Sequence, residues 1–242
     1  MATRLSINVN KFALIRNSRG ENMPDLLDIS RKCIEYGSKG ITVHPRPDER
    51  HVRYSDLEPL RKLTSEYEDI EFNIEGYPSD DFLKKVVEVK PDQVTFVPDP
   101  PDALTSSFGW DLEVNKMFLT KICRECREND IRSSLFISPE LKGLEYLNHI
   151  GADRVELYTY DYARYYKIDP ASAITPYKQV VDYLKANCNV SINAGHDLSQ
   201  ENLAYLLSEL KFIDEVSIGH ALVCDSLIDG LEKTVTSYSD LV

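Results

Sequence analysis

The chain has 242 residues, with 28 lysines and arginines against 40 aspartates and glutamates, and a net charge of −12 at pH 7. This acidic balance argues against a broad nucleic-acid-binding face, which must neutralise phosphates, and against binding to an anionic membrane surface. With 42% hydrophobic residues the chain can bury a full core, and no apolar stretch approaches the ~18 residues of a membrane span.

Short β-branched runs alternate with longer segments of helical periodicity along the whole chain. We predict strands over 5–10, 40–45, 71–76, 93–98, 132–138, 154–159, 190–195 and 215–220. Helical patterns lie between and after them, over 24–36, 55–67, 80–89, 111–128, 140–150, 170–186, 199–210 and 221–238. Eight strands that each precede a helix predict an α/β fold, a (β/α)₈ TIM barrel that forms a single domain over residues 1–242.

The cysteines indicate a reducing compartment. Their number is odd, and the one C-x-x-C lies inside a helical pattern; the five are Cys33, Cys123, Cys126, Cys188 and Cys224. Reduced, partly buried thiols are the expected state, rather than a zinc or redox site. Because the N-terminus enters a strand pattern without a signal-peptide core, we expect the protein to be cytoplasmic.

Polar residues gather at or just past the C-terminal ends of the predicted strands. They are Asn8, Asn10, His44, Glu75, Glu156, His196 and His220. In a barrel these ends meet at one mouth, where the βα loops build active sites. Two imidazoles and two carboxylates with tunable pKa values suit successive proton transfers, such as imine formation, enolisation and dehydration.

Two regions favour anions. The segments NAGHDLS and IGHALV each put Gly-His just before a helix, where backbone N–H groups and the helix dipole bind phosphate. The loops after strands one and two carry clustered basic residues, which are Lys11, Arg16, Arg19, Arg46, Arg50, His51 and Arg53. Local pairing with Asp48 or Glu49 explains Arg50 or Arg53. Two separate positive regions predict a ligand set with two phosphate groups.

Other readings of the mouth remain open. No strand ends in lysine, so a Schiff-base aldolase lacks its nucleophile unless Lys11 serves. A mixed metal site of the four titratable side chains is a rival, although no H-x-H pair or aspartate cluster supports it. The tyrosine-rich stretch 158–166 reads as a long loop that acts as a lid, an oligomer contact or packing.

Across essentially the whole chain, the sequence resembles the pyridoxine 5'-phosphate synthase family of vitamin B6 biosynthesis. The resemblance lies in INVNKFALIRNSRG, GITVHPRPDERH, FNIEG, VTFVP, VELYT, INAGHDL and SIGHAL, in the family's order and spacing. It implies a TIM barrel with additional short helices, assembled as a homo-octamer. It also implies condensation of 1-deoxy-D-xylulose 5-phosphate with 3-amino-2-oxopropyl phosphate to pyridoxine 5'-phosphate, phosphate and water, without metal or cofactor.

The resemblance also implies roles for single residues. His44 and Glu75 would be proton acceptors, His196 the proton donor, and Glu156 would stabilise a transition state. The residues matching positions that hold the aminoketone phosphate are Asn8, Arg19, Asp197, Gly219 and His220. Those matching positions that hold the deoxyxylulose phosphate are Asn10, Lys11, Arg46, His51 and Thr105.

The chain departs from the family pattern at several of these positions. Asn10 and Lys11 replace a frequent Asp-His pair, and Asp197 replaces a glycine often found after the catalytic histidine. Cys224 and Asp225 replace a Gly-Arg pair, while Tyr158 and Tyr160 replace a His and a Gly. A phosphosugar aldolase or isomerase of altered specificity, or a non-catalytic barrel that binds phosphorylated metabolites, are therefore alternatives.

Overall fold

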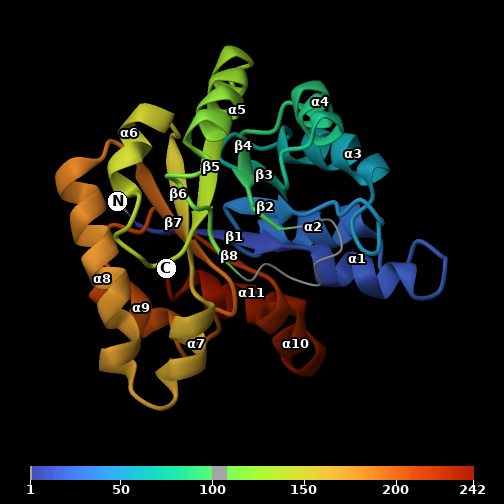
Figure 1. Ribbon diagram of the computed structural model, residues 1–242. Helices are drawn as coiled ribbons and strands as arrows, with labels where there is room; N and C mark the ends of the chain where they lie inside the picture. Colours follow the sequence, from blue (N-terminus) through green and yellow to red (C-terminus); the bar gives the residue numbers. More distant parts are fainter. Residues whose placement is uncertain (1, 100–107) are drawn as a thin grey trace.

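The computed structural model describes residues 2–99 and 108–242, and its strands form a closed parallel barrel. In chain order they are β1 (Arg4–Asn8), β2 (Gly40–Val43), β3 (Glu71–Gly76), β4 (Gln93–Phe96), β5 (Arg132–Ile137), β6 (Arg154–Tyr158), β7 (Ser191–Gly195) and β8 (Glu215–Ile218). Each strand pairs with the next, and β1 pairs with β8 through registers such as Ile7 with Ile218 (Figure 1). The predicted TIM barrel is confirmed.

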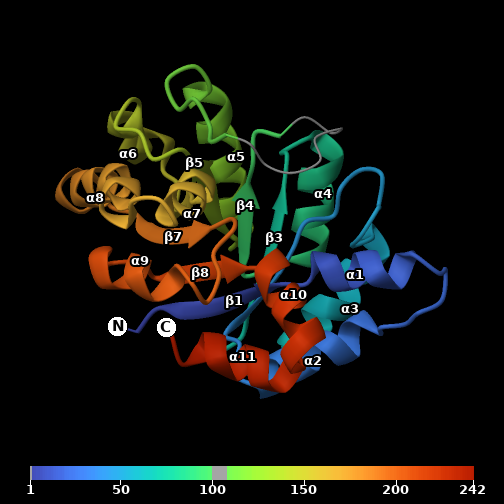
Figure 2. The ribbon, with the colours of Figure 1, turned by 90° about the horizontal axis from the view of Figure 1, so that it is seen from below.

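The helices surround this barrel, as the two views in Figure 1 and Figure 2 show. They are α1 (Asn10–Asn17), α2 (Leu26–Glu35), α3 (Tyr54–Thr64), α4 (Asp80–Val89), α5 (Lys116–Glu128), α6 (Leu147–Ile150), α7 (Tyr160–Tyr166), α8 (Pro170–Asn187), α9 (Leu203–Glu209), α10 (His220–Asp229) and α11 (Leu231–Ser239), with a 3₁₀ turn, η1 (Leu144–Tyr146). Side-chain caps fix several starts: Asp25 accepts from the amide of Leu27, and Ser79 from that of Phe82. Among the described residues, no helix is both long enough and apolar enough to cross a bilayer.

Several predicted boundaries were wrong. The tyrosine-rich stretch is not a long loop, because Tyr160–Tyr166 forms α7, and buried Tyr162 holds this helix to the barrel by donating from its hydroxyl to the carbonyl of Asn202 at 2.6 Å. The stretch after strand one is likewise helical, as α1. The helix predicted over 221–238 is two helices, because Gly230 lies at φ +84° between them.

Other helices are shorter than their periodicity predicted. The pattern over 111–128 begins with turns and becomes helical only at Lys116, and that over 140–150 reduces to η1 and α6. The 199–210 pattern is helical only from Leu203 to Glu209. Apolar spacing marked which side chains face the barrel, but the first turns of these segments are irregular.

The side chains inside the barrel are unusually polar. Alternation along each strand turns residues such as Leu5 and Ile7 outward to the helices, where they join the apolar core. The inward positions carry small polar groups that bond across strands: the hydroxyls of Ser6 and Thr42 lie 2.8 Å apart, and Asn73 donates to Thr42 at 3.3 Å. Most barrels of this fold are filled by layers of branched apolar side chains, whereas hydrogen-bonded polar side chains occupy the interior of this one.

Charged residues close the barrel at the N-terminal ends of the strands. Glu71, Arg132, Arg154 and Glu215 each begin a strand, and Glu71 pairs with both arginines. Arg154 Nη1 lies 3.9 Å from Glu215 Oε2. Burial raises the pKa of Glu215 to about 7, with Glu71 adding to the effect. This network lies at the opposite end of the strands from the mouth, so it belongs to the stability of the barrel rather than to the site.

Candidate active site

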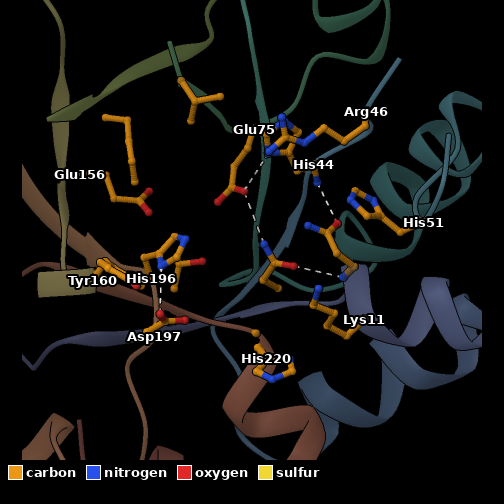
Figure 3. A pocket seen from close by; sticks show the side chains of 16 residues that line it. Lys11, His44, Arg46, His51, Glu75, Glu156, Tyr160, His196, Asp197 and His220 are labelled. Atoms are coloured by element: carbon orange, nitrogen blue, oxygen red, sulfur yellow. Dashed lines mark hydrogen bonds and ion pairs between the residues drawn. The ribbon is translucent and has the colours of Figure 1, made fainter. Parts of the chain in front are cut away.

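A cavity of about 370 Å³ opens at the C-terminal ends of the strands. Its lining consists of Asn8, Asn10, Lys11, His44, Arg46, His51, Glu75, Val97, Phe136, Glu156, Tyr160, His196, Asp197, Ser217, Gly219 and His220, which Figure 3 draws. The volume is within the range of small-molecule sites. The seven polar residues predicted to meet at one mouth do so, because the parallel strands all end there.

The structure separates the predicted site residues into three groups. Twelve of them line the cavity: Asn8, Asn10, Lys11, His44, Arg46, His51, Glu75, Glu156, His196, Asp197, Gly219 and His220. Arg19 is exposed just after α1 and is not part of the lining. Thr105 lies outside the described residues. Roles for all of them remain predictions.

His44 and Glu75 form a buried pair. Nδ1 of His44 lies 3.6 Å from Oε2 of Glu75, and Asn8 donates to the same oxygen at 3.4 Å. Burial and, to a lesser extent, the nearby charge of Arg46 lower the pKa of His44 to about 3. Burial raises the pKa of Glu75 to about 7, against the opposing charges of Arg46 and His196. A neutral imidazole therefore lies beside a carboxyl group that titrates near neutrality, which suits proton transfer.

Glu156 faces the cavity from β6, three strands along the barrel from the strand of Glu75. Burial raises its pKa well above the ordinary value, and the charges of Glu75 and Glu215 raise it further. Burial therefore favours the protonated form of Glu156, which is able to donate a hydrogen bond. Its position depends on Gly195, because a Cβ at that residue would lie 2.3 Å from Oε1 of Glu156.

His196 lies in a backbone turn that side chains rarely adopt. Its φ is +91°, and that of Asp197 is +57°. Such conformations cost about 1–3 kcal/mol each and cluster at functional sites. Thr159 holds the turn by donating from its hydroxyl to the carbonyls of Gly195 and His196, at 2.7 and 2.6 Å.

Arg46 and His51 are buried at one side of the cavity. Arg46 bonds Oδ2 of Asp99 at 2.9 Å, and both side chains are almost fully buried. The amide of Val52 donates to Nδ1 of His51 at 2.9 Å. Burial lowers the pKa of His51 to about 3, so the neutral ring carries its proton on Nε2 and can donate it to an anion.

Three of the other basic residues of the first two loops have structural partners. Arg16 forms two bonds of 2.9 Å with the carboxylate of Asp56. Arg53 bonds Asn17, and Arg50 lies 3.5 Å from Asp48. None of these three arginines is in the cavity lining. The local pairing expected for Arg50 is therefore present, while Arg46 and Lys11 supply the cationic side chains of the cavity.

The N-termini of α1 and α10 both begin at the cavity. Asn10 opens α1, where its amide donates to Oδ1 of Asn8 at 3.1 Å, and Gly219 and His220 open α10, whose N-cap residue Gly219 makes no side-chain cap. Their N–H groups and helix dipoles favour an anion there. Lys11 adds a positive side chain on α1. Helices α1 and α10 lie side by side (Figure 2), so these groups border one region of the cavity.

The departures from the family pattern differ in their consequences. The amide of His44 donates to Oδ1 of Asn10 at 2.9 Å, so Asn10 also ties β1 to the end of β2. Asp225 accepts from Gln200 at 3.0 Å and from the Tyr238 hydroxyl at 2.9 Å, and it is outside the cavity lining. The carboxylate of Asp197 lies beside His196, with 3.5 Å between Oδ2 and Nδ1.

Sequence reasoning missed four residues of the lining. Val97, Phe136, Tyr160 and Ser217 border the cavity. Three of them carried a usable signal, since Val97, Phe136 and Ser217 continue the inward-facing positions of their strands. Tyr160 was placed in a loop of unknown role, and only the formation of α7 brings its ring to the cavity.

A metal site is not evident among these side chains. Within residues 2–99 and 108–242, no three His, Cys, Asp or Glu residues are grouped so that they could hold an ion. The alternative of a mixed site made by His44, Glu75, Glu156 and His196 finds no support there. The five cysteines are unpaired, and Cys33, Cys123 and Cys126 are buried.

Comparison with known proteins gives a consistent result. A family model described as pyridoxal phosphate biosynthesis protein PdxJ matches residues 5–242. The pyridoxine 5'-phosphate synthases of Bacteroides fragilis (strain YCH46) and Cytophaga hutchinsonii are each 48% identical to the chain. Each match covers 98% of the chain, and it covers 98% of the Bacteroides protein and 97% of the Cytophaga protein. A Mycobacterium tuberculosis tryptophan synthase structure matches 99% of the chain and 93% of its own with a TM-score of 0.65, at 14% identity, and so shares the fold.

Proposed function

Because the chain belongs to the pyridoxal phosphate biosynthesis protein PdxJ family, we propose that it is a pyridoxine 5'-phosphate synthase. Its relatives' names and the family make it an enzyme of vitamin B6 biosynthesis. The proposed reaction condenses 1-deoxy-D-xylulose 5-phosphate with 3-amino-2-oxopropyl phosphate, giving pyridoxine 5'-phosphate, inorganic phosphate and water, without a metal or organic cofactor.

One observation carries the proposal: two imidazoles and two carboxyl groups meet in a cavity that also has two places for an anion. Arg46 and His51 border one of them. The N-terminus of α10, with Gly219 and His220, borders the other, and the charge of Lys11 at the start of α1 reaches both His51 and Asp197. A pair of phosphorylated substrates fits this arrangement, because each phosphate needs its own donors.

The chemistry requires several proton transfers. The amine of one substrate attacks the ketone of the other, and the carbinolamine must lose water. Phosphate then leaves, and ring closure needs further proton removal. Glu75 is suited to accept protons because its pKa is near neutrality, and His44, a neutral imidazole at that pH, is the second proposed acceptor. His196 is the proposed proton donor.

Glu156 has a different proposed part. A protonated carboxyl group donates a hydrogen bond to oxygen on which negative charge develops, and this stabilises the transition state. Asn8, Gly219 and His220 are proposed to hold the aminoketone phosphate, with Asp197 contributing its backbone N–H and Arg19 reaching it from outside the cavity lining. Asn10, Lys11, Arg46 and His51 are proposed to hold the deoxyxylulose phosphate, together with Thr105.

A direct assay tests the function. Metal-stripped protein in chelator is mixed with both substrates, and pyridoxine 5'-phosphate and inorganic phosphate are measured in parallel. Equal release of both products supports the proposal. Binding of either substrate without turnover favours a non-catalytic barrel, and turnover of a different ketose phosphate favours an aldolase or isomerase of altered specificity.

Assembly and location are proposed on the same family membership. We propose a homo-oligomer, an octamer as in the family, located in the cytoplasm. Light scattering on the purified protein measures the assembly: a mass of eight 27.7 kDa chains agrees, whereas a monomer contradicts it.

A further inference from the structure

The carboxylate of Asp197 lies against the ring of the proposed proton donor. Its Oδ2 is 3.5 Å from Nδ1 of His196 (Figure 3). The neighbouring imidazole of His196 is the largest influence on Asp197 and lowers the pKa of this carboxyl group, so it is ionised at neutral pH. The opposite edge of the imidazole is turned away from Asp197, toward the cavity (Figure 3).

Two tyrosine rings hold the imidazole from the side of α7. Tyr158 meets it edge-on, with ring centroids 4.9 Å apart and an angle of 81°, and Tyr160 does so at 5.9 Å and 80°. The two tyrosines are stacked on each other, 5.9 Å apart at an angle of 7°. The ring of His196 therefore packs against an aromatic pair and faces a carboxylate at one nitrogen.

The backbone fixes this arrangement further. The amide side chain of Asn202 donates to the carbonyl of Asp197 at 3.2 Å, and Thr159 holds the preceding carbonyls. Both His196 and Asp197 have positive φ. In this conformation the two adjacent side chains face each other.

We propose that Asp197 is a positioning residue for His196, which holds the imidazole with Nδ1–H toward its carboxylate and Nε2 toward the cavity. The inference rests on the proposed function, in which His196 donates a proton to the substrate. A carboxylate in this place fixes the tautomer of the neutral ring and stabilises its protonated form. Asp197 then favours the form of His196 that is able to donate a proton.

This role differs from the one that the family resemblance gives to this position, which is contact with a phosphate. A residue that only binds substrate changes KM. A residue that positions His196 changes the protonation of that ring in the free protein and changes kcat. The two roles are therefore separable by measurement.

The groups around His196 define what else influences its titration. They are Glu75 from β3, Tyr158 and Tyr160 from β6 and α7, Glu156 from β6, His220 from α10 and Lys11 from α1. All are present in both the parent and an Asp197 variant. A difference in the titration of His196 between the two proteins is therefore caused by the loss of the Asp197 carboxylate.

Nuclear magnetic resonance of the ligand-free protein, with histidine labelled at Cε1, tests the proposal. The chain has five histidines, and the signal of His196 is identified by its loss in H196Q. In D197N and D197G the titration midpoint of His196 should be lower than in the parent. Asparagine and glycine both tolerate a positive φ, so the turn should be kept.

D161N is the matched control, because Asp161 is an exposed residue in the first turn of α7 and its loss removes the same charge. Its His196 midpoint should stay within about 0.2 units of the parent. D197E should recover part of the shift. An unchanged midpoint in both D197N and D197G, or an equal fall in D161N, overturns the proposal.

Kinetics link the shift to catalysis. In D197N, kcat should fall about 10- to 100-fold and its alkaline limb should move to lower pH, with KM changed by less than about threefold. A variant with altered KM and an unaltered profile has lost a binding group only, which overturns the proposal. A parent protein without synthase activity overturns the proposed function instead, while the ring titration still shows whether Asp197 governs His196.

Discussion

Nδ1 of His44 lies 3.6 Å from Oε2 of Glu75 where β2 and β3 reach the cavity, and the side chain of His44 is buried while that of Glu75 is 13% exposed. Burial shifts the pKa values of the two groups in opposite directions, because it disfavours the charged form of each, the cationic imidazole and the anionic carboxylate. The pair thus remains close to neutral, with the pKa of Glu75 at about 7. Its protonation state can change at the pH of the cell, as a proton acceptor requires.

The rate should depend on the ionisation of Glu75. As the pH falls through about 7, this carboxylate takes up a proton and stops accepting one, so kcat should decline toward about pH 6. In E75Q, kcat should fall about 10²–10⁴-fold and lose this acid limb. Steady-state kinetics between pH 5.5 and 9 measure both effects. A fully active E75Q would remove Glu75 from the mechanism.

The same substitution at Glu156 should have a much smaller effect. Burial raises its pKa well above the ordinary value and favours the protonated form, and glutamine retains a donor of similar shape. We expect E156Q to keep kcat within about tenfold of the parent and E156A to lose about 10²–10³-fold. Equal losses in the two variants would show that Glu156 acts as a carboxylate.

Gly195 should be required for the position of Glu156. A methyl group at this residue would lie 2.3 Å from Oε1, and the end of a flexible side chain can move aside. G195A should therefore fold, with a far-ultraviolet circular dichroism spectrum like the parent's, and lose at least tenfold in kcat. The double variant G195A/E156A should lose no more than E156A alone, and additive losses would contradict this explanation.

Lys11 should act in binding. It lines the cavity at the start of α1, where a point charge favours a phosphate. K11M should raise KM for one phosphorylated substrate about tenfold, with kcat within threefold, and weaken the dependence of KM on salt. K167M is the control, since Lys167 is exposed and paired with Glu201. Similar KM values in K11M and the parent would place the phosphate elsewhere.

The network of charged residues at the N-terminal ends of the strands should make the free energy of unfolding depend on pH. The pKa of Glu215 is raised to about 7 in the folded protein, so its stabilising contribution is full below the unfolded pKa and is lost as the pH rises from about 4.5 through 7. E215Q lacks this titration. Relative to the parent, its free energy of unfolding in urea should rise by about 3 kcal/mol between pH 4.5 and 8.

Exposed Glu201, changed to glutamine, provides the comparison for this measurement, because its carboxylate is in solvent. A pH-independent difference between E215Q and the parent would mean that Arg154 keeps Glu215 ionised throughout the range.

Local sequence could not predict the helices around the site in full. The periodicity over 221–238 is continuous in its apolar positions, yet Gly230 divides it. The stretch 158–166 resembles a loop because tyrosines lack a clear periodicity, and it becomes α7 when Tyr162 is buried and bonded to Asn202. Tertiary contacts decide such segments, since helix propensity differs little among these residues.

The sequence by itself determined the barrel and the side of it on which the chemistry lies. Alternating strand and helix patterns admit few topologies, and parallel strands necessarily bring Asn8, His44, Glu75 and Glu156 to one end. Only the tertiary structure decided which charges meet. Arg16 pairs with Asp56 and Arg46 with Asp99, whereas Asp197 turns to His196. Pairing and burial join residues far apart in the chain, and pKa values follow from that packing, which no local pattern contains.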